Sequence, residues 1–197
     1  MLTAAVAALA LAASPGPKEL VQKLDTEVQT ILKSSDASTE KLSARADEFI
    51  DFVELSKRAM GAEWSKLSRQ QQDQLGATMK GLLRASYAQK AIKDDRGGAA
   101  NVTYGEEKIE GNDAEVKTTL AVKSDKFSVN YKLYRRDAKA DWRIFDVVTD
   151  EVSLVETYKD QFKKQMAKNG FDGLISALKK KQESLEKQNA ETSAKKN

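Results

Sequence analysis

Residues 115–133 read EVKTTLAVKSDKFSVNYKL, and apolar and polar side chains alternate through both halves of this stretch. Alternation with a period of two puts the apolar side chains of a β-strand on one face. Ser124 and Asp125 separate the two halves and form a short polar turn of the kind that joins antiparallel strands. The stretch therefore predicts a β-hairpin with one apolar face.

Further strands are predicted on both sides of this hairpin. Upstream, an alternating segment begins at Val102 and Tyr104 and ends at a turn over residues 111–113. Downstream, residues 142–148 read WRIFDVV and form another strand-like run. Together these segments predict a twisted antiparallel sheet of four to five strands.

Segments with helical spacing surround the predicted strands. In each of them apolar residues recur at intervals of three and four, which is typical of an amphipathic helix. The segments run from Leu20 to Leu32, from Leu42 to Leu55, from Leu75 to Ile92 and from Leu154 to Met166. The chain therefore predicts an α+β domain in which several helices gather on one face of the antiparallel sheet.

Individual residues predict where these helices begin and end. Ser68 and Gln71 have the spacing of a capping box, and Asn169–Gly170 is a good stop for the helix from Leu154 to Met166. One more apolar stripe follows from Phe171 to Leu178. Gly76 and Gly81 lie inside the third helix, where each costs about 1 kcal/mol relative to alanine. Either another element or a ligand approaches the backbone closely there, or the helix tolerates them.

Charge and composition restrict the function. The 197 residues carry a formal net charge of +3 and contain no His and no Cys. The lysine-rich end after residue 178 accounts for the excess of positive charge, so the remaining chain is neutral and lacks the basic face that a nucleic-acid partner requires. A thiol nucleophile, an imidazole base, a disulfide and a metal site built from His or Cys are all excluded.

The two ends of the chain differ from its middle. Residues 2–13 are Ala, Val or Leu except for Thr3, a run of signal-peptide length that is too short to span a bilayer. A signal peptidase would cleave after Ala10 or after Ser14. The alternative interpretation of this run is an Ala-rich N-terminal helix of a cytosolic protein. We expect a signal-peptide-like segment at 1–14, a single domain at 17–180 and a charged, disordered tail at 181–197.

One stretch resembles a known family. Residues 142–162, WRIFDVVTDEVSLVETYKDQF, are similar to the signature of the MlaC family, the toluene-tolerance auxiliary proteins, in which a W-x-I-x-D-V strand runs into G-V-S-L-V and a helix. Residues 61–87 show that family's G-x-x-W-x-x-L-x-x-x-Q and L-L-x-x-x-Y spacing. Glu151 departs from the usual glycine, and Leu75–Gly76 stand where a phenylalanine usually follows the glutamine.

The resemblance implies a function. Proteins of this family are periplasmic phospholipid carriers that act as auxiliary components of an ABC transporter and maintain outer-membrane lipid asymmetry. The implied partners are an inner-membrane ABC complex with an MCE domain and an outer-membrane lipoprotein–porin complex, which a monomer would contact transiently. The resemblance implies neither a cofactor nor a catalytic residue.

The resemblance also turns the predicted core into an apolar pocket between sheet and helices, in a cone-like fold similar to that of nuclear transport factors. The residues expected to form its walls are Phe49, Phe52, Val53, Met79, Leu82, Leu83, Leu120 and Phe162. The residues expected at its mouth combine an apolar ring with a polar tip and are Tyr87, Tyr104, Tyr131, Trp142 and Tyr158. Ordinary core packing is the alternative for each of them.

Other functions stay open. A pocket enzyme could use Asp146 as its base, with Tyr131 or Tyr104 as hydrogen-bond donor. An interaction or chaperone module would instead bind proteins through exposed apolar surface. Within the carrier hypothesis, apolar walls discriminate poorly between a phospholipid, a single-chain lipid and a polycyclic lipid such as a hopanoid.

Overall fold

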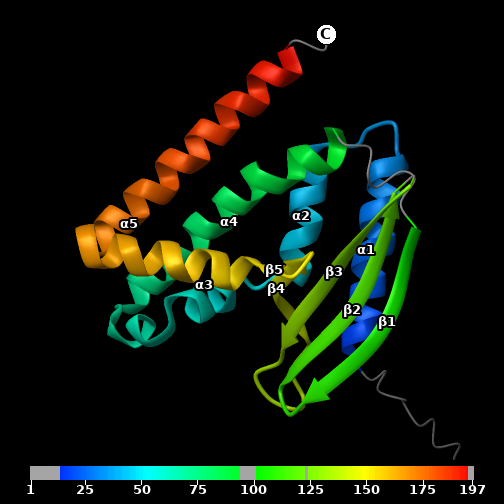
Figure 1. Cartoon of the computed structure of the whole chain (residues 1–197), viewed down its shortest axis with the longest axis horizontal. Coiled ribbons are helices and arrows are strands. Elements are labelled where there is room, and N and C mark those ends of the chain that lie inside the picture. Colours follow the sequence, from blue (N-terminus) through cyan, green and yellow to red (C-terminus); the bar gives the residue numbers. More distant parts are fainter. Residues whose placement is uncertain (1–13, 94–100, 123, 195–197) are drawn as a thin grey trace, which may run out of the picture.

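The sheet is a five-stranded antiparallel meander in which each strand pairs with its neighbour in sequence (Figure 1). The computed structural model describes residues 14–93, 101–122 and 124–194, so the signal-peptide-like segment lies outside the described residues up to residue 13. The strands are β1 (Asn101–Glu110), β2 (Asp113–Val122), β3 (Asp125–Tyr134), β4 (Arg143–Thr149) and β5 (Val152–Ser153). The predicted hairpin and the α+β class are confirmed.

Helices precede and follow the sheet. They are α1 (Pro17–Lys33), α2 (Thr39–Phe49), α3 (Phe52–Met60), the 3₁₀-helix η1 (Gly61–Lys66), α4 (Arg69–Lys93) and α5 (Leu154–Ala194). Helix α1 runs along the sheet, whereas α2 to α5 gather beside β4 and β5 (Figure 1). In the described ranges, every helix is too short or too polar to span a bilayer.

A β-bulge in β4 places helices on both faces of the sheet, although one face was expected. Lys132 pairs with Asp146 and Leu133 with Ile144, so Phe145 is an extra residue in its strand. A bulge re-aims the side chains around it. Ile144 packs in the cluster beneath α1, whereas Phe145 packs in the cluster of α3, α4 and α5.

The predicted second helix is broken, because the chain changes direction at Ile50 and Asp51. Both residues adopt extended backbone angles, and the N–H of Asp51 donates to the carbonyl of Ile144 in β4 at 2.8 Å. The helical spacing from Leu42 to Leu55 continues across this break and therefore did not reveal it. The capping box of Ser68 and Gln71, in contrast, is confirmed at the start of α4.

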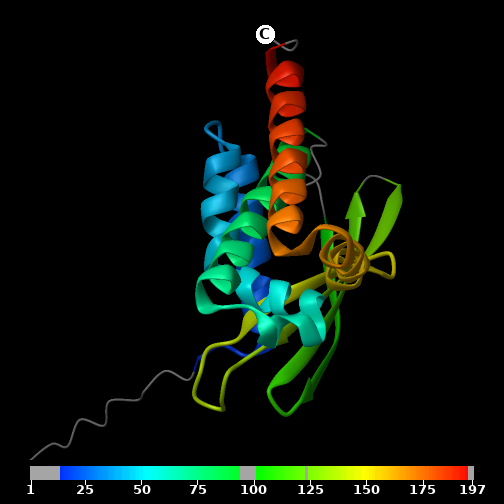
Figure 2. The same cartoon turned by 90° about the vertical axis from the view of Figure 1, so that its left-hand side faces the viewer.

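Helix α5 consists of two arms that meet at Gly170, where φ is +64°. Figure 2 views the first arm almost end-on while the second runs across the view, so the arms point in different directions. The expectation of disorder after residue 180 is wrong for residues 181–194, which are helical. Leu185 packs against the helical core, and the Asn189 amide donates to the carbonyl of Ala85 at 2.9 Å.

The glycines of α4 have different surroundings. A Cβ atom on Gly76 would lie 2.7 Å from Cγ2 of Val53, so this glycine allows α3 and α4 to approach closely. The three atoms nearest to a Cβ atom on Gly81 would all belong to the side-chain amide of Gln182. Close approach of another element is therefore confirmed at Gly76.

Candidate ligand cavity

An apolar cavity of about 590 Å³ lies between the two core clusters. It follows the edge of β4, which pairs with β5 only at Val148 and Thr149 and with the preceding chain at Ile144. Helices α2, α3 and α4 and the start of α5 enclose the other side. The lining residues are Val28, Leu42, Ser43, Ala46, Asp47, Ile50, Phe52, Leu55, Leu83, Arg84, Tyr87, Ile144, Phe145, Asp146, Val147, Thr149, Val152, Leu154 and Thr157.

The cavity has a buried floor and an exposed mouth. At the floor, Leu55 is 2% exposed and Ile144 is fully buried. At the mouth, Tyr87 is 50% and Val152 63% exposed, and they are two of the three exposed large hydrophobic residues among those described. An apolar interior with such a lip has the form of a site for an amphiphilic ligand.

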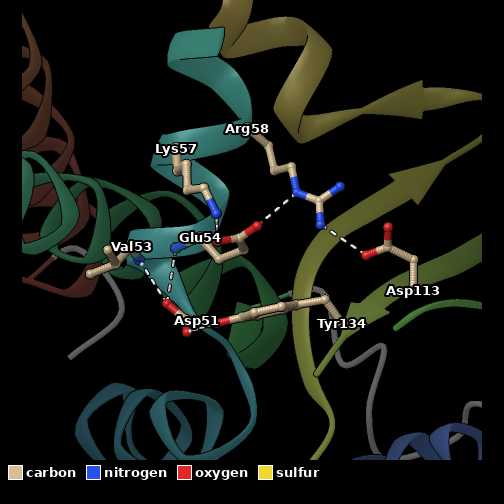
Figure 3. Close-up of polar contacts among 7 residues, drawn as sticks. All are labelled: Asp51, Val53, Glu54, Lys57, Arg58, Asp113 and Tyr134. Carbon is tan, nitrogen blue, oxygen red and sulfur yellow. Dashed lines mark hydrogen bonds and ion pairs between the residues drawn. The ribbon is translucent and has the colours of Figure 1, made fainter. Parts of the chain in front are cut away.

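Asp51 fixes the floor of the cavity by holding α3 in place (Figure 3). Its Oδ1 accepts hydrogen bonds from the N–H groups of Val53 and Glu54, both at 3.0 Å, and so caps α3. Its Oδ2 accepts a 2.5 Å hydrogen bond from the hydroxyl of Tyr134 in β3. Burial, together with this carboxylate, raises the pKa of the Tyr134 phenol.

A second polar contact joins α3 to the sheet (Figure 3). The buried carboxylate of Glu54 accepts hydrogen bonds from Lys57 at 2.9 Å and from Nε of Arg58 at 2.7 Å. Arg58 also donates to Asp113 at the start of β2, at 2.8 Å, and its guanidinium lies 4.4 Å from the ring centroid of Phe145. Both contacts hold Phe52 and Leu55 at the cavity floor.

Asp146, the base in the alternative enzyme hypothesis, caps α5. It is 1% exposed and accepts hydrogen bonds from the Ser153 hydroxyl at 2.6 Å and from the Val155 N–H at 3.1 Å. Lys132 Nζ lies 3.7 Å from the same carboxylate. The hydroxyl of Tyr104, proposed as its donor partner, instead donates to Asp25 at 2.6 Å. Asp146 therefore has the hydrogen-bond partners of a helix-capping residue and not those of a base in a pocket.

Three of the predicted site residues line the cavity, namely Phe52, Leu83 and Tyr87. Most of the others pack in the core or beneath α1, because α1 covers the face of the sheet on which the pocket was expected. Those in or against the core clusters are Phe49, Met79, Leu82, Tyr104, Tyr131, Trp142, Tyr158 and Phe162. Leu120 is half-buried on β2, and Val53 lines a separate polar cleft.

The polar cleft adjoins the cavity. It has a volume of about 600 Å³ and shares Asp47, Ile50 and Phe52 with the cavity lining. Its remaining lining includes charged groups such as Lys80 and Arg143. Asp47 pairs with Lys80 at 2.8 Å and with Arg84, so the negative charge of this carboxylate is neutralised within the protein.

The sequence reasoning missed most of the lining. Leu42, Ala46, Leu55 and Leu154 belong to the apolar stripes already recognised, and helical spacing was the available signal. That spacing does not tell which stripe faces a cavity. The answer depends on the break at Ile50 and on the bulge, which are tertiary features.

Comparisons with known proteins agree with this architecture. The family model described as MlaC protein matches residues 18–180. A phospholipid-binding protein from Ralstonia solanacearum, solved in complex with a phospholipid, superposes with a TM-score of 0.76 at 24% sequence identity. The superposition covers 87% of this chain and 99% of that protein, which shows a shared fold. No curated protein matches the chain.

Proposed function

The chain belongs to the MlaC family, and from this premise we propose that it is a periplasmic carrier that buries acyl chains of a phospholipid in the cavity beside β4. The carried lipid would move between an inner-membrane ABC complex with an MCE domain and an outer-membrane complex. The bound phospholipid in the Ralstonia solanacearum protein supports the ligand class. The family match supports the place in transport.

The apolar cavity is the observation that carries this proposal. A lipid chain in water gains about 0.8 kcal/mol for each methylene group that is buried, so a sixteen-carbon chain gains on the order of 12 kcal/mol. Leu42, Ile50 and Leu55 offer the required apolar contact without any specific chemistry. A sealed floor and an open mouth suit a ligand whose chain is buried and whose headgroup stays in water.

The mouth supports the same orientation. The exposed residues Arg84, Thr149 and Thr157 line the cavity together with Tyr87 and Val152. Polar groups at the rim and apolar groups below it match the polarity of a phospholipid from headgroup to chain. The headgroup would therefore meet water and hydroxyl groups at the rim.

Catalysis is not part of the proposal. Two carboxylates line the described cavity: Asp146 accepts hydrogen bonds from Ser153 and Val155, and Asp47 pairs with Lys80 and Arg84. Both oxygens of Asp146 therefore already accept hydrogen bonds from groups at the start of α5, and these contacts direct neither of them at a substrate. Carriage without chemical change is the simpler use of the cavity.

Native mass spectrometry with organic extraction tests the proposal. The protein would be purified without detergent from a Gram-negative periplasm, and we expect a co-purified phospholipid at one molecule per chain. Ala46→Trp places a bulky ring in the cavity lining and should lower the amount of bound lipid, whereas Ala77→Trp on the polar cleft should leave it unchanged. A wild-type protein that emerges empty and takes up no lipid from vesicles would refute carriage and favour an interaction module.

A further inference from the structure

The positive charge of the protein is concentrated around the bend of α5. Residues 159–181, which we call the basic elbow, contain seven lysines and two aspartates. All other residues together contain 26 Lys and Arg against 28 Asp and Glu. The basic elbow therefore carries a net charge of +5 and the rest of the chain a net charge of −2.

Most of the lysines in the basic elbow lack a partner within the protein. Lys159 pairs with Glu156 at 3.0 Å, and Nζ of Lys181 lies 5.9 Å from the ring centroid of Tyr158. The other five are exposed, and their ammonium groups form no ion pair or hydrogen bond with the described part of the chain; they are Lys163, Lys164, Lys168, Lys179 and Lys180. These five charges are available to an anionic partner outside the protein.

The bend places the basic elbow at one end of the molecule. The two arms of α5 meet at Gly170 and fold back toward one another, because Lys181 in the second arm reaches Tyr158 in the first. Figure 1 shows this junction at the extreme of the molecule, beside η1. The first arm begins at Leu154, about 24 Å along the helix from Gly170. A surface that contacts the junction therefore lies away from Leu154, which lines the cavity near its mouth.

The composition of the basic elbow favours a lipid surface over a protein as its partner. Its cations are all lysines, and arginine is absent from residues 159–181. Protein interfaces are instead depleted in lysine and enriched in arginine and aromatic residues. The three exposed large hydrophobic residues of the described ranges, Tyr87, Ile109 and Val152, also lie outside the elbow. Clusters of lysine without an apolar anchor are typical of adsorption to anionic lipid headgroups.

From these observations we propose that the basic elbow adsorbs the protein to an anionic lipid surface. This inference goes beyond the proposed function, because adsorption needs no lipid in the cavity. Each lysine near such a surface raises the affinity about fivefold, and the attraction extends about 8 Å at physiological salt. The contact is therefore reversible, and it keeps the protein at the membrane while the cavity mouth stays free.

Sedimentation with vesicles tests this adsorption. The protein purified from the periplasm would be mixed with phosphatidylcholine vesicles that contain or lack phosphatidylglycerol. We expect binding to the vesicles with phosphatidylglycerol and far weaker binding to those without it. Binding should disappear at about 1 M salt, where the screening length falls to about 3 Å.

A triple variant places the contact on the elbow. Lys163→Gln, Lys164→Gln and Lys168→Gln together should lower the affinity for anionic vesicles by about 100-fold. The matched control removes the same charge from three exposed lysines on other parts of the protein, by Lys33→Gln, Lys126→Gln and Lys139→Gln, and should lower the affinity less than about fivefold. Both variants should still co-purify with the same lipid as the wild type.

A second variant covers the structural role of these lysines. Lys164 and Lys168 lie near the end of the first arm, where positive charge also stabilises the helix. Urea unfolding would show a loss of stability from this cause. If the triple variant does not fold, Lys179→Gln with Lys180→Gln in the second arm should still lower vesicle affinity by about 25-fold.

The outcomes decide between adsorption and its alternatives. A salt-sensitive preference for anionic vesicles that falls with the elbow variants and not with the control supports the proposal. Equal binding to neutral and anionic vesicles, or equal losses in the elbow and control variants, overturns it. A wild-type protein that binds neither kind of vesicle also overturns it and assigns the elbow to an acidic protein surface. Carriage is measured separately by the co-purified lipid, so it stands or fails independently.

Discussion

Replacing Gly76 by alanine is expected to disturb the contact between α3 and α4. The new Cβ atom would lie 2.7 Å from Cγ2 and 3.4 Å from Cα of Val53. Val53 is β-branched, so its methyl groups have little freedom to move away. Such overpacking costs about 1–3 kcal/mol. Alanine recovers about 1 kcal/mol of helix preference, which leaves a net loss of about 1 kcal/mol in the free energy of unfolding.

Gly81 provides the matched control in the same helix. A Cβ atom there would meet the side-chain amide of Gln182, the far end of a flexible side chain that can rotate away. Gly81→Ala should therefore raise the free energy of unfolding by up to about 1 kcal/mol. In urea unfolding followed by tryptophan fluorescence, an m-value of about 2 kcal/mol/M puts the two midpoints about 1 M apart. A Gly76→Ala protein at least as stable as wild type would refute the close-packing argument.

Three further predictions concern stability. Glu151 has φ of +69°, so Glu151→Gly should raise the free energy of unfolding by about 0.5 kcal/mol after the entropy of glycine is subtracted. Thermal unfolding should show no such gain for Glu151→Ala. Equal stability of the two variants would argue against backbone strain at this position. Leu185→Ala should lower the free energy of unfolding in urea by about 1–2 kcal/mol, whereas Lys187→Ala should hardly change it. Equal losses in the two variants would mean that the second arm of α5 is not packed against the core. Burial raises the pKa of Tyr158 to about 12. The folded state then holds this proton above the ordinary tyrosine pKa of about 10, so stability should fall as pH rises from about 10 to about 12. Unfolding midpoints measured across this range should fall less for Tyr158→Phe, and parallel curves would contradict the assignment.

Local patterns predicted the elements of this fold well. The alternation in residues 115–133 requires only neighbouring side chains on a pleated strand, and the structure pairs Val116 with Tyr131 and Leu120 with Phe127 accordingly. The capping box at Ser68 and the stop at Gly170 are likewise decided within one helical turn. Glu151 was recognised as a departure from the glycine that is usual in the family, and its positive φ shows that the backbone at this position favours glycine.

The position of the cavity was not predictable in the same way. An extra residue at Phe145 in β4 and a break at Ile50 decide which side chains face it, and both depend on contacts between distant segments. Leu120 and Tyr131 carried the same apolar signal as Leu55, yet Tyr131 packs with the cluster beneath α1 while Leu55 lines the cavity. The helical end of the chain was missed because Leu185 is an isolated apolar residue among charges.

The central claim is that an acyl chain lies in the cavity with its end at the floor beside β4. The most direct measurement is photocrosslinking with a phospholipid that carries a diazirine at the end of one chain, followed by peptide mapping of the labelled protein. We predict labels on peptides that contain Phe52 and Leu55 or Ile144 and Phe145. Labels confined to the exposed face of β1 or to the outer surface of α1, with none at the floor, would contradict the account.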